Sequence, residues 1–340
     1  MSGRSLGQWQ NYLGTFKSRE FAGHRSKVHS LDWNCTGSRL ASGSTDHTVR
    51  IWTLDSLLSA TAAAAAAGAD TTTAPTPSLA GSASIELKGH TASIDQLAWS
   101  PTNADLLATI STDKTLRLWD VSSHSQLGAP IFTDRENINL AWSRDGRHMV
   151  VGGRDDTLCL VDVERREVVR QRAFSQEINE LAWSQTGEIF VARGNGYIDI
   201  LDGTTLETTR SLAGHTANCY CLKFTKDGRY FAVGGADAVI SLWEYAELAC
   251  VRTFCRLDWP IRTLAFSAGG ELLAAGSEDS YIDISLVRTG EPAFKIPTTA
   301  ATNTLSWHPS RTLLAYAGDH VDSRSSRSTG TIFLFAPHHQ

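Results

Sequence analysis

Residues 89–120 read GHTASIDQLAWSPTNADLLATISTDKTLRLWD, and the rest of the chain repeats the pattern of this stretch. A Gly-His pair comes first, followed by an apolar strand that ends at Trp99, a turn, a second apolar strand and a tight turn that carries Asp113. The stretch ends with the run from Thr115 to Asp120, whose alternation with a period of two is typical of a β-strand. The stretch therefore predicts consecutive strands that are joined by tight turns.

The centre of this pattern is a leucine two residues before an aromatic residue, and it occurs seven times. The seven leucines are Leu31, Leu97, Leu140, Leu181, Leu222, Leu264 and Leu305. Neighbouring leucines are 41 to 43 residues apart, except that the first interval is 66 residues. A period of about 40 to 45 residues with four strands in each unit is typical of a β-propeller blade. We therefore predict an all-β fold, a seven-bladed β-propeller.

The long first interval is explained by an insert at residues 60–84, which contains six successive alanines followed by threonine, proline, glycine and serine. This composition cannot form a packed core, so we predict that the insert is disordered. A second insertion is the Ser/Arg-rich loop at residues 320–330. Its Arg324 and Arg327 are candidate partner-binding residues that could also contact phosphate, and the alternative is a solvated loop tip.

The two ends of the repeat predict how the ring closes. The seventh unit ends near Phe335, after its third strand, whereas the segment from Phe16 to Phe21 is an extra strand before the first unit. An open ring would leave two sheet edges exposed, and exposed edges promote aggregation. We therefore predict that the N-terminal strand completes the last blade. The propeller then covers residues 16–340, and we expect residues 1–15 to form a flexible leader.

The composition is that of a globular protein. Of the 340 residues, 41% are apolar and 20% are charged, and 31 Lys and Arg against 36 Asp and Glu give a net charge of −5. This balance excludes a strongly basic nucleic-acid binder. Because the chain has no long apolar run and no apolar signal core, we expect neither membrane contact nor secretion. We then expect the six cysteines to be free thiols in a reducing compartment.

Three sets of residues have the spacing of a buried hydrogen-bond chain. The sets are His24, Ser42, Asp46 and Trp52; His90, Thr109, Asp113 and Trp119; and His215, Asp237 and Trp243. The third set is incomplete, because Val233 occupies the position of the hydroxyl. A Ser/His/Asp trio could also be a catalytic triad, but a nucleophile would not be repeated from blade to blade. We therefore interpret these sets as structural, with the carboxylate holding the imidazole and the hydroxyl linking it to the indole.

Other patterns of chemistry are weak. Cys219 and Cys221 near His215 do not have a convincing zinc spacing, and we interpret the two thiols as core residues. The chain has no phosphate-binding glycine loop and no hydrolase or zinc-protease motif. An enzyme in the central channel would need convergent acids, but Asp32, Asp95 and Glu180 form no ligand set. We predict no catalytic residue, no metal and no cofactor.

The segment from Arg256 to Pro260 departs from the repeat, in the link into the sixth unit. It contains Arg256, Asp258 and Trp259. Because tryptophan and arginine dominate the energetic centres of protein interfaces, we predict that these residues bind a partner. The alternative is a tryptophan that covers its own blade.

The Gly-His pairs and the Trp119-Asp120 pair resemble the WD-repeat family over nearly the whole chain, which implies the propeller fold but no particular function. The segments 136–143, 194–201, 235–243 and 250–264 are similar, in addition, to the THO-complex members of that family. This resemblance implies a nuclear, non-enzymatic subunit that couples transcription and mRNA processing to mRNA export. It also implies docking on a large helical scaffold subunit, with an RNA helicase and an export adaptor reached through the assembled complex. With a net charge of −5, we expect weak or indirect RNA binding.

A second function remains open at this point, because many WD-repeat proteins are substrate receptors of cullin ubiquitin ligases. Those receptors usually carry an arginine two positions after a Trp-Asp pair. Here Trp119-Asp120 is followed by Val121-Ser122, so the signature is missing. A generic protein-interaction propeller is the remaining alternative.

Overall fold

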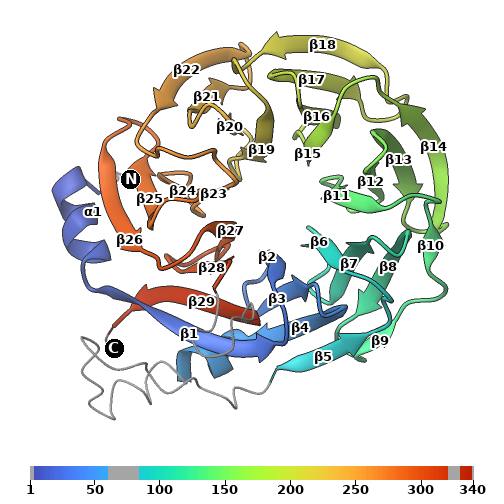
Figure 1. Ribbon diagram of the computed structural model, residues 1–340, viewed down its shortest axis with the longest axis horizontal. Helices are drawn as coiled ribbons and strands as arrows, with labels where there is room; N and C mark the ends of the chain where they lie inside the picture. The colour runs from blue at the N-terminus through green and yellow to red at the C-terminus, as the bar shows by residue number, and fades with distance from the viewer. Residues whose placement is uncertain (1–3, 60–83, 321–329, 339–340) are drawn as a thin grey trace.

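The computed structural model describes residues 4–59, 84–320 and 330–338. In these residues seven antiparallel sheets surround a central opening (Figure 1). We number the sheets as blades 1 to 7 in the order of their innermost strands along the chain. The predicted disordered insert at 60–84 and the predicted loop at 320–330 lie outside the described residues, apart from Ser84, His320 and Gly330.

The first four blades follow the order of the chain. Blade 1 contains β2 (Val28–Trp33), β3 (Arg39–Ser44), β4 (Thr48–Thr53) and β5 (Ile85–Lys88). Blade 2 contains β6 (Ile94–Trp99), β7 (Leu106–Ser111), β8 (Thr115–Asp120), β9 (Ser125–Gln126) and β10 (Ile131–Phe132). Blade 3 contains β11 (Asn137–Trp142), β12 (His148–Gly153), β13 (Thr157–Asp162) and β14 (Glu167–Ala173). Blade 4 contains β15 (Ile178–Trp183), β16 (Glu188–Arg193), β17 (Tyr197–Asp202) and β18 (Thr208–Ala213).

The last three blades include the closure of the ring. Blade 5 contains β19 (Cys219–Phe224), β20 (Tyr230–Gly235), β21 (Ile240–Glu244) and β22 (Ala249–Phe254). Blade 6 contains β23 (Thr263–Phe266), β24 (Leu272–Gly276), β25 (Tyr281–Leu286) and β26 (Pro292–Pro297). Blade 7 contains β27 (Thr302–Trp307), β28 (Leu314–Gly318), β29 (Gly330–Pro337) and β1 (Phe16–His24).

The N-terminal strand closes the ring as predicted. β1 pairs antiparallel with β29, with Phe16 opposite Pro337 and Ala22 opposite Thr331 (Figure 1). β29 in turn pairs with β28 in the same sheet. The prediction of a seven-bladed propeller closed by the N-terminal strand is therefore confirmed.

The core lies between the blades. Buried apolar side chains of the described residues form seven clusters, and each cluster joins two adjacent sheets. For example, Phe190 of blade 4 packs with Phe231 and Trp243 of blade 5, and the last two rings are stacked with centroids 5.9 Å apart. Eight tryptophans of the repeat lie in these clusters: Trp33, Trp52, Trp99, Trp119, Trp142, Trp183, Trp243 and Trp307.

Tryptophans at the ends of the innermost strands also connect neighbouring blades by hydrogen bonds. The indole N–H of Trp99 donates to the carbonyl of Asp32 at 3.0 Å, and that of Trp183 donates to the carbonyl of Ala141 at 3.1 Å. Trp33 and Trp142 make the same kind of bond to the preceding blade. The indole therefore provides both apolar area and a directional link, which a phenylalanine at this position cannot provide.

At residues 4–15 the structure differs from the flexible leader that was predicted for residues 1–15. Residues Leu6–Leu13 form the helix α1, which begins with a capping box between Ser5 and Gln8. Trp9 and Leu13 are buried, because they pack beside β26, and the Gln10 side chain donates to the carbonyl of Pro292 at 3.3 Å. Figure 1 shows α1 on the outer side of blade 6. None of the helices in the described residues is long and apolar enough to cross a membrane.

Candidate interaction sites

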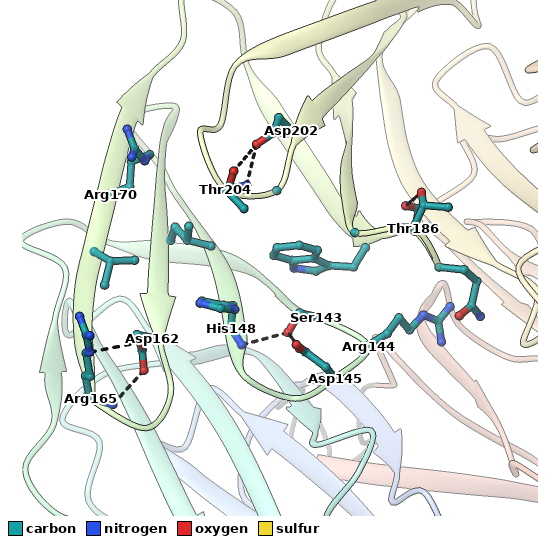
Figure 2. Close-up of a pocket in the computed structure, with 17 residues that line it drawn as sticks. Ser143, Arg144, Asp145, His148, Asp162, Arg165, Arg170, Thr186, Asp202 and Thr204 are labelled. Atoms are coloured by element: carbon teal, nitrogen blue, oxygen red, sulfur yellow. Dashed lines mark hydrogen bonds and ion pairs between the residues drawn. The ribbon is translucent and has the colours of Figure 1, made fainter.

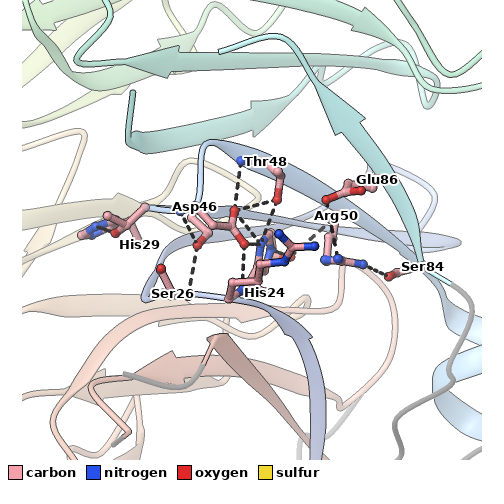
Figure 3. Close-up of polar contacts among 12 residues, drawn as sticks. His24, Ser26, His29, Asp46, Thr48, Arg50, Ser84 and Glu86 are labelled. Carbon is pink, nitrogen blue, oxygen red and sulfur yellow. Dashed lines mark hydrogen bonds and ion pairs between the residues drawn. The ribbon is translucent and has the colours of Figure 1, made fainter. Parts of the chain in front are cut away.

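The first hydrogen-bond chain links His24, at the end of β1 in blade 7, to three residues of blade 1 (Figure 3). The Nδ1 atom of His24 is 3.0 Å from the Asp46 carboxylate, and its Nε2 atom is 2.8 Å from the Ser42 hydroxyl. The indole of Trp52 donates to the same hydroxyl at 3.0 Å. Since this oxygen accepts from the indole, its own proton is available for Nε2, and Nδ1 donates to the carboxylate. Every polar atom of the set is thereby satisfied.

The second chain repeats this geometry in blade 2. His90 lies 2.8 Å from Asp113 through Nδ1 and 2.8 Å from the Thr109 hydroxyl through Nε2. The Trp119 indole donates to that hydroxyl at 2.8 Å. The sequence spacing thus corresponds to an actual chain of bonds in both blades.

The third chain is complete, in contrast to the sequence-based expectation. The hydroxyl comes from Ser241, which lies 2.9 Å from Nε2 of His215 and accepts from the Trp243 indole at 2.8 Å. His215 is also 3.1 Å from the Asp237 carboxylate. Ser241 lies directly opposite Val233 across the β20–β21 ladder, so a hydroxyl on either strand reaches the same place. The sequence signal was a serine two residues before Trp243, where the other two blades have arginine.

The electrostatics of the first two chains favour ionised carboxylates at Asp46 and Asp113, and in the second chain a neutral imidazole at His90. Burial would raise the pKa of Asp46 and Asp113, but hydrogen bonds from the histidine, a threonine hydroxyl and a backbone N–H hold both pKa values well below the usual range. Burial lowers the pKa of His90. The hydroxyls of Ser42, Thr109 and Ser241 are buried, so these three sets are not placed to reach a substrate.

Polar side chains of the innermost strands contact one another between blades, and Figure 1 shows β2, β6, β11, β15, β19, β23 and β27 as the innermost strands of the ring. Lys223 pairs with Glu180 at 3.4 Å, and the Gln96 amide donates to the same carboxylate at 3.2 Å. Burial raises the pKa of Asp32 to about 6. The parts of the chain that the structure describes contain no group of three or more His, Cys, Asp or Glu side chains that could hold a metal ion.

The cysteines have no arrangement for redox or metal chemistry. All six lie within the described residues and are free thiols. Cys219 and Cys221 are buried, and burial raises the pKa of Cys219 to about 12 and that of Cys221 further still. A thiol with a raised pKa is a poor nucleophile at neutral pH.

The structure gives Arg256 a role that differs from the predicted partner contact. Its Nε and Nη2 atoms donate to the carboxylate of Asp283 at 3.1 and 2.8 Å, and Nη1 donates to the carbonyl of Gly290 at 2.8 Å. The Asp283 side chain is only 3% exposed. The guanidinium is therefore occupied in holding blade 6 together, because its removal would leave a buried carboxylate without its counter-ion.

Trp259 remains a candidate for partner contact. Its side chain is 53% exposed, whereas the backbone that carries it is fixed: the N–H groups of Asp258 and Trp259 donate to the buried Asp279 carboxylate at 3.1 and 3.3 Å. In blades 1 and 2 the corresponding carboxylates accept a hydrogen bond from the backbone N–H of the residue that follows the histidine. Leu257 thus occupies the histidine position and is buried. Trp259 is an exposed aromatic side chain on a rigid backbone. Arg324 and Arg327, the other predicted contacts, lie outside the described residues.

A groove that the sequence did not reveal lies between blades 3 and 4 (Figure 2). Its volume is about 730 Å³, and its lining includes Leu160, Val169, Arg170 and Trp183. These residues come from several hairpins, and their proximity depends on how two blades pack. The one signal in the sequence was the pair Val168-Val169 between the charged residues Glu167 and Arg170.

Comparisons with known proteins agree on one family. A family model described as the THOC3 beta-propeller domain matches residues 24–317. The chain is 41% identical over 319 residues to THO complex subunit 3 of Arabidopsis thaliana, which covers 94% of this chain and 95% of the relative. It is 35% identical over 321 residues to WD repeat-containing protein AAC3 of Dictyostelium discoideum, which covers 92% of this chain and 66% of the relative.

Proposed function

This chain belongs to the THO complex subunit 3 family, and on that premise we propose that it is a non-enzymatic scaffold subunit of a nuclear THO complex that couples transcription and mRNA processing to mRNA export. The observation that carries the proposal is the 41% identity over nearly the full length of both chains. The geometry supports a scaffold, because the Ser/Thr, His and Asp sets are buried and the Asp32, Glu180 and Lys223 side chains form no metal-binding group among the described residues.

The proposed partners are the other THO subunits, above all the large helical scaffold subunit. A ring of seven sheets is rigid and offers two faces and a rim to such partners. Trp259 is the anchor that we propose for one contact, since its backbone is held by Asp279 before binding. The RNA helicase and the export adaptor would be reached through the assembled complex. We propose that RNA contact by this subunit alone is weak or indirect.

Affinity purification of the tagged full chain from nuclear extract, followed by mass spectrometry, tests this function. We expect the THO subunits to be recovered in stoichiometric amounts. Recovery of cullin ligase components in their place would favour the substrate-receptor alternative. The missing arginine after Trp119-Asp120 argues against that alternative.

A further inference from the structure

The groove between blades 3 and 4 is lined mainly by polar and charged side chains, with an apolar strip formed by Leu160, Val169 and Trp183. Leu160 and Trp183 are 4% and 7% exposed at its base, and Val169 on its wall is 42% exposed. Figure 2 shows the groove open between the outer strand of blade 3 and the turns of blade 4. An exposed valine over a buried indole is a surface that a partner could cover.

An equivalent position occurs between blades 6 and 7. The β13–β14 ladder is irregular at Val169, which lies between the paired residues Val168 and Arg170. The β25–β26 ladder has the same irregularity at Ala293. Trp183 ends the innermost strand of blade 4, just as Trp307 ends that of blade 7. The register therefore makes Val169 and Ala293 equivalent positions.

The chain's own helix α1 covers this place between blades 6 and 7. Trp9 and Leu13 of α1 belong to one buried cluster with Ala293 and Trp307. Ala293 is consequently only 3% exposed, whereas its equivalent Val169 is 42% exposed. The molecule thus shows what occupies such a groove: a short amphipathic helix with large apolar side chains four residues apart.

Charge distinguishes the open groove from the covered one. Arg170 pairs with Leu160 in blade 3. At the equivalent position of blade 6, Phe294 pairs with Ile284. Among the described residues the side chains of Arg170 and Arg144 have no hydrogen-bond or ion-pair partner. The Asp145 and Asp202 carboxylates at the groove accept hydrogen bonds within their own turns, and the third carboxylate, Asp162, pairs with Arg165 at 3.8 Å. The groups left to pair are therefore guanidinium groups, which favour carboxylates.

We propose that the groove between blades 3 and 4 docks an amphipathic helix of a partner subunit, with large apolar residues on one face and Asp or Glu beside them. The apolar face lies over Val169 and Trp183, and the acidic residues pair with Arg170 and Arg144. This inference deepens the proposed function, on which it rests for the partner's membership of the assembly.

Blade 5 provides a matched control position. Val251 is the equivalent of Val169 and is 46% exposed. There, however, Arg252 donates to the carbonyl of Arg288 in blade 6 at 3.0 Å, so its guanidinium crosses the groove and is occupied. We therefore expect no helix at Val251.

Photo-crosslinking from the assembled complex tests the proposal. The full-length chain would carry benzoylphenylalanine at position 169 or, as the control, at position 251, and mass spectrometry would identify the crosslinked peptide. We expect position 169 to crosslink to an acidic, amphipathic helical segment of a THO subunit. Equal yields from the two positions, or crosslinks to RNA, to a basic segment or to this chain's own residues, would overturn the proposal. A crosslink to an acidic amphipathic helix of a protein outside the THO complex would support the groove as a docking site for such a helix. It would contradict the proposed membership of the THO complex.

Binding of the crosslinked segment, made as a labelled peptide, gives the second measurement. By fluorescence anisotropy we expect Val169→Asp and Arg170→Glu to weaken binding at least about tenfold, since a desolvated contact and a charge pair are lost. Val251→Asp should leave affinity unchanged, and all three variants should melt as the parent does. Exchange of the peptide's acidic residues for lysine should restore binding to Arg170→Glu. Equal affinity of the parent and both groove variants would refute the site.

Discussion

Ser241 shows that a polar chain can be preserved when its hydroxyl moves to another strand. From the sequence we predicted His215, Asp237 and Trp243 but expected the hydroxyl at residue 233. That expectation assumed that the hydroxyl occupies the same position of the repeat in every blade. The structure places Ser241 directly across the ladder from Val233. Reading such a set from sequence therefore requires the strand register as well as the spacing.

We predict that Ser241→Ala lowers the free energy of unfolding by about 1 to 3 kcal/mol, because His215 and Trp243 would each lose a buried partner. The double variant Val233→Ser, Ser241→Ala should regain part of that loss, since the new hydroxyl lies opposite the old one. Urea unfolding monitored by tryptophan fluorescence gives both values. If the double variant were less stable than both single variants, the proposed equivalence of the two positions would be wrong.

Asp32 predicts a pH-dependent change in stability. Burial raises its folded pKa to about 6, above the ordinary value near 3.8, so the folded state binds a proton more tightly than the unfolded state between these pH values. Stability contributed by the protonated form is thus lost as the pH rises from about 4 to 6. We expect Asp32→Asn to be about 3 kcal/mol more stable than the parent at pH 7.5 and nearly equal to it at pH 4.

The measurement is chemical unfolding of both proteins at the two pH values. The exposed Asp134→Asn is the control for exchanging a surface carboxyl for an amide. A destabilised Asp32→Asn at pH 7.5 would show that the ionised carboxylate is favourable at this buried position.

We predict different effects on stability for substitutions of Arg256 and Trp259, which both lie in the link into blade 6. Arg256→Ala should destabilise the protein by about 2 to 4 kcal/mol, since it leaves the buried Asp283 carboxylate without its counter-ion. Trp259→Ala should change stability by less than about 0.5 kcal/mol, as an exposed substitution does. It should nevertheless reduce recovery of THO subunits in the purification, and Tyr197→Ala, another exposed aromatic side chain, should not. Unchanged recovery with Trp259→Ala would remove Trp259 from the interface.

At the scale of elements, the strands were easier to predict than the helix. β1 was predicted because the seventh unit lacks a fourth strand and an open ring would expose two sheet edges. α1 has only eight residues, and an isolated helix of that length is marginal in water. Its stability comes from burying Trp9 and Leu13 against blade 6, which no local pattern reveals.

Closure of the ring by β1 gives the prediction at this scale. Phe21 is fully buried in the cluster between blades 7 and 1, so Phe21→Ala should cost about 3 to 5 kcal/mol of folding free energy. Lys17→Ala on the exposed side of the same strand should be nearly neutral. Thermal unfolding compares the two variants, and equal melting temperatures would mean that β1 contributes little to closure.

At the scale of the whole molecule, the number of blades could be predicted from sequence because the repeat period is set within each blade. The groove between blades 3 and 4 could not, because Leu160, Val169 and Trp183 meet only when two blades pack. The role of Arg256 was equally hidden, since its partner Asp283 is 27 residues away along the chain. Sequence periodicity thus predicts architecture far better than it predicts surfaces.

The net charge of −5 predicts weak RNA binding by the isolated chain. Filter binding with single-stranded RNA at physiological salt should show no saturation in the nanomolar range, and the assembled THO complex should bind more tightly under the same conditions. Nanomolar binding by the chain alone would mean that a local basic surface outweighs the overall charge.

The pairing of β1 with β29 has a consequence for synthesis on the ribosome. Ala22 is translated about 300 residues before its partner Thr331, which at about 5 to 20 residues per second is a delay of roughly 15 to 60 s. During that time β1 has been synthesised but its partner β29 has not, while the residues of six blades emerge from the ribosome. Pairing of the strand that is synthesised first with the strand that is synthesised last is therefore the final step in closing the ring.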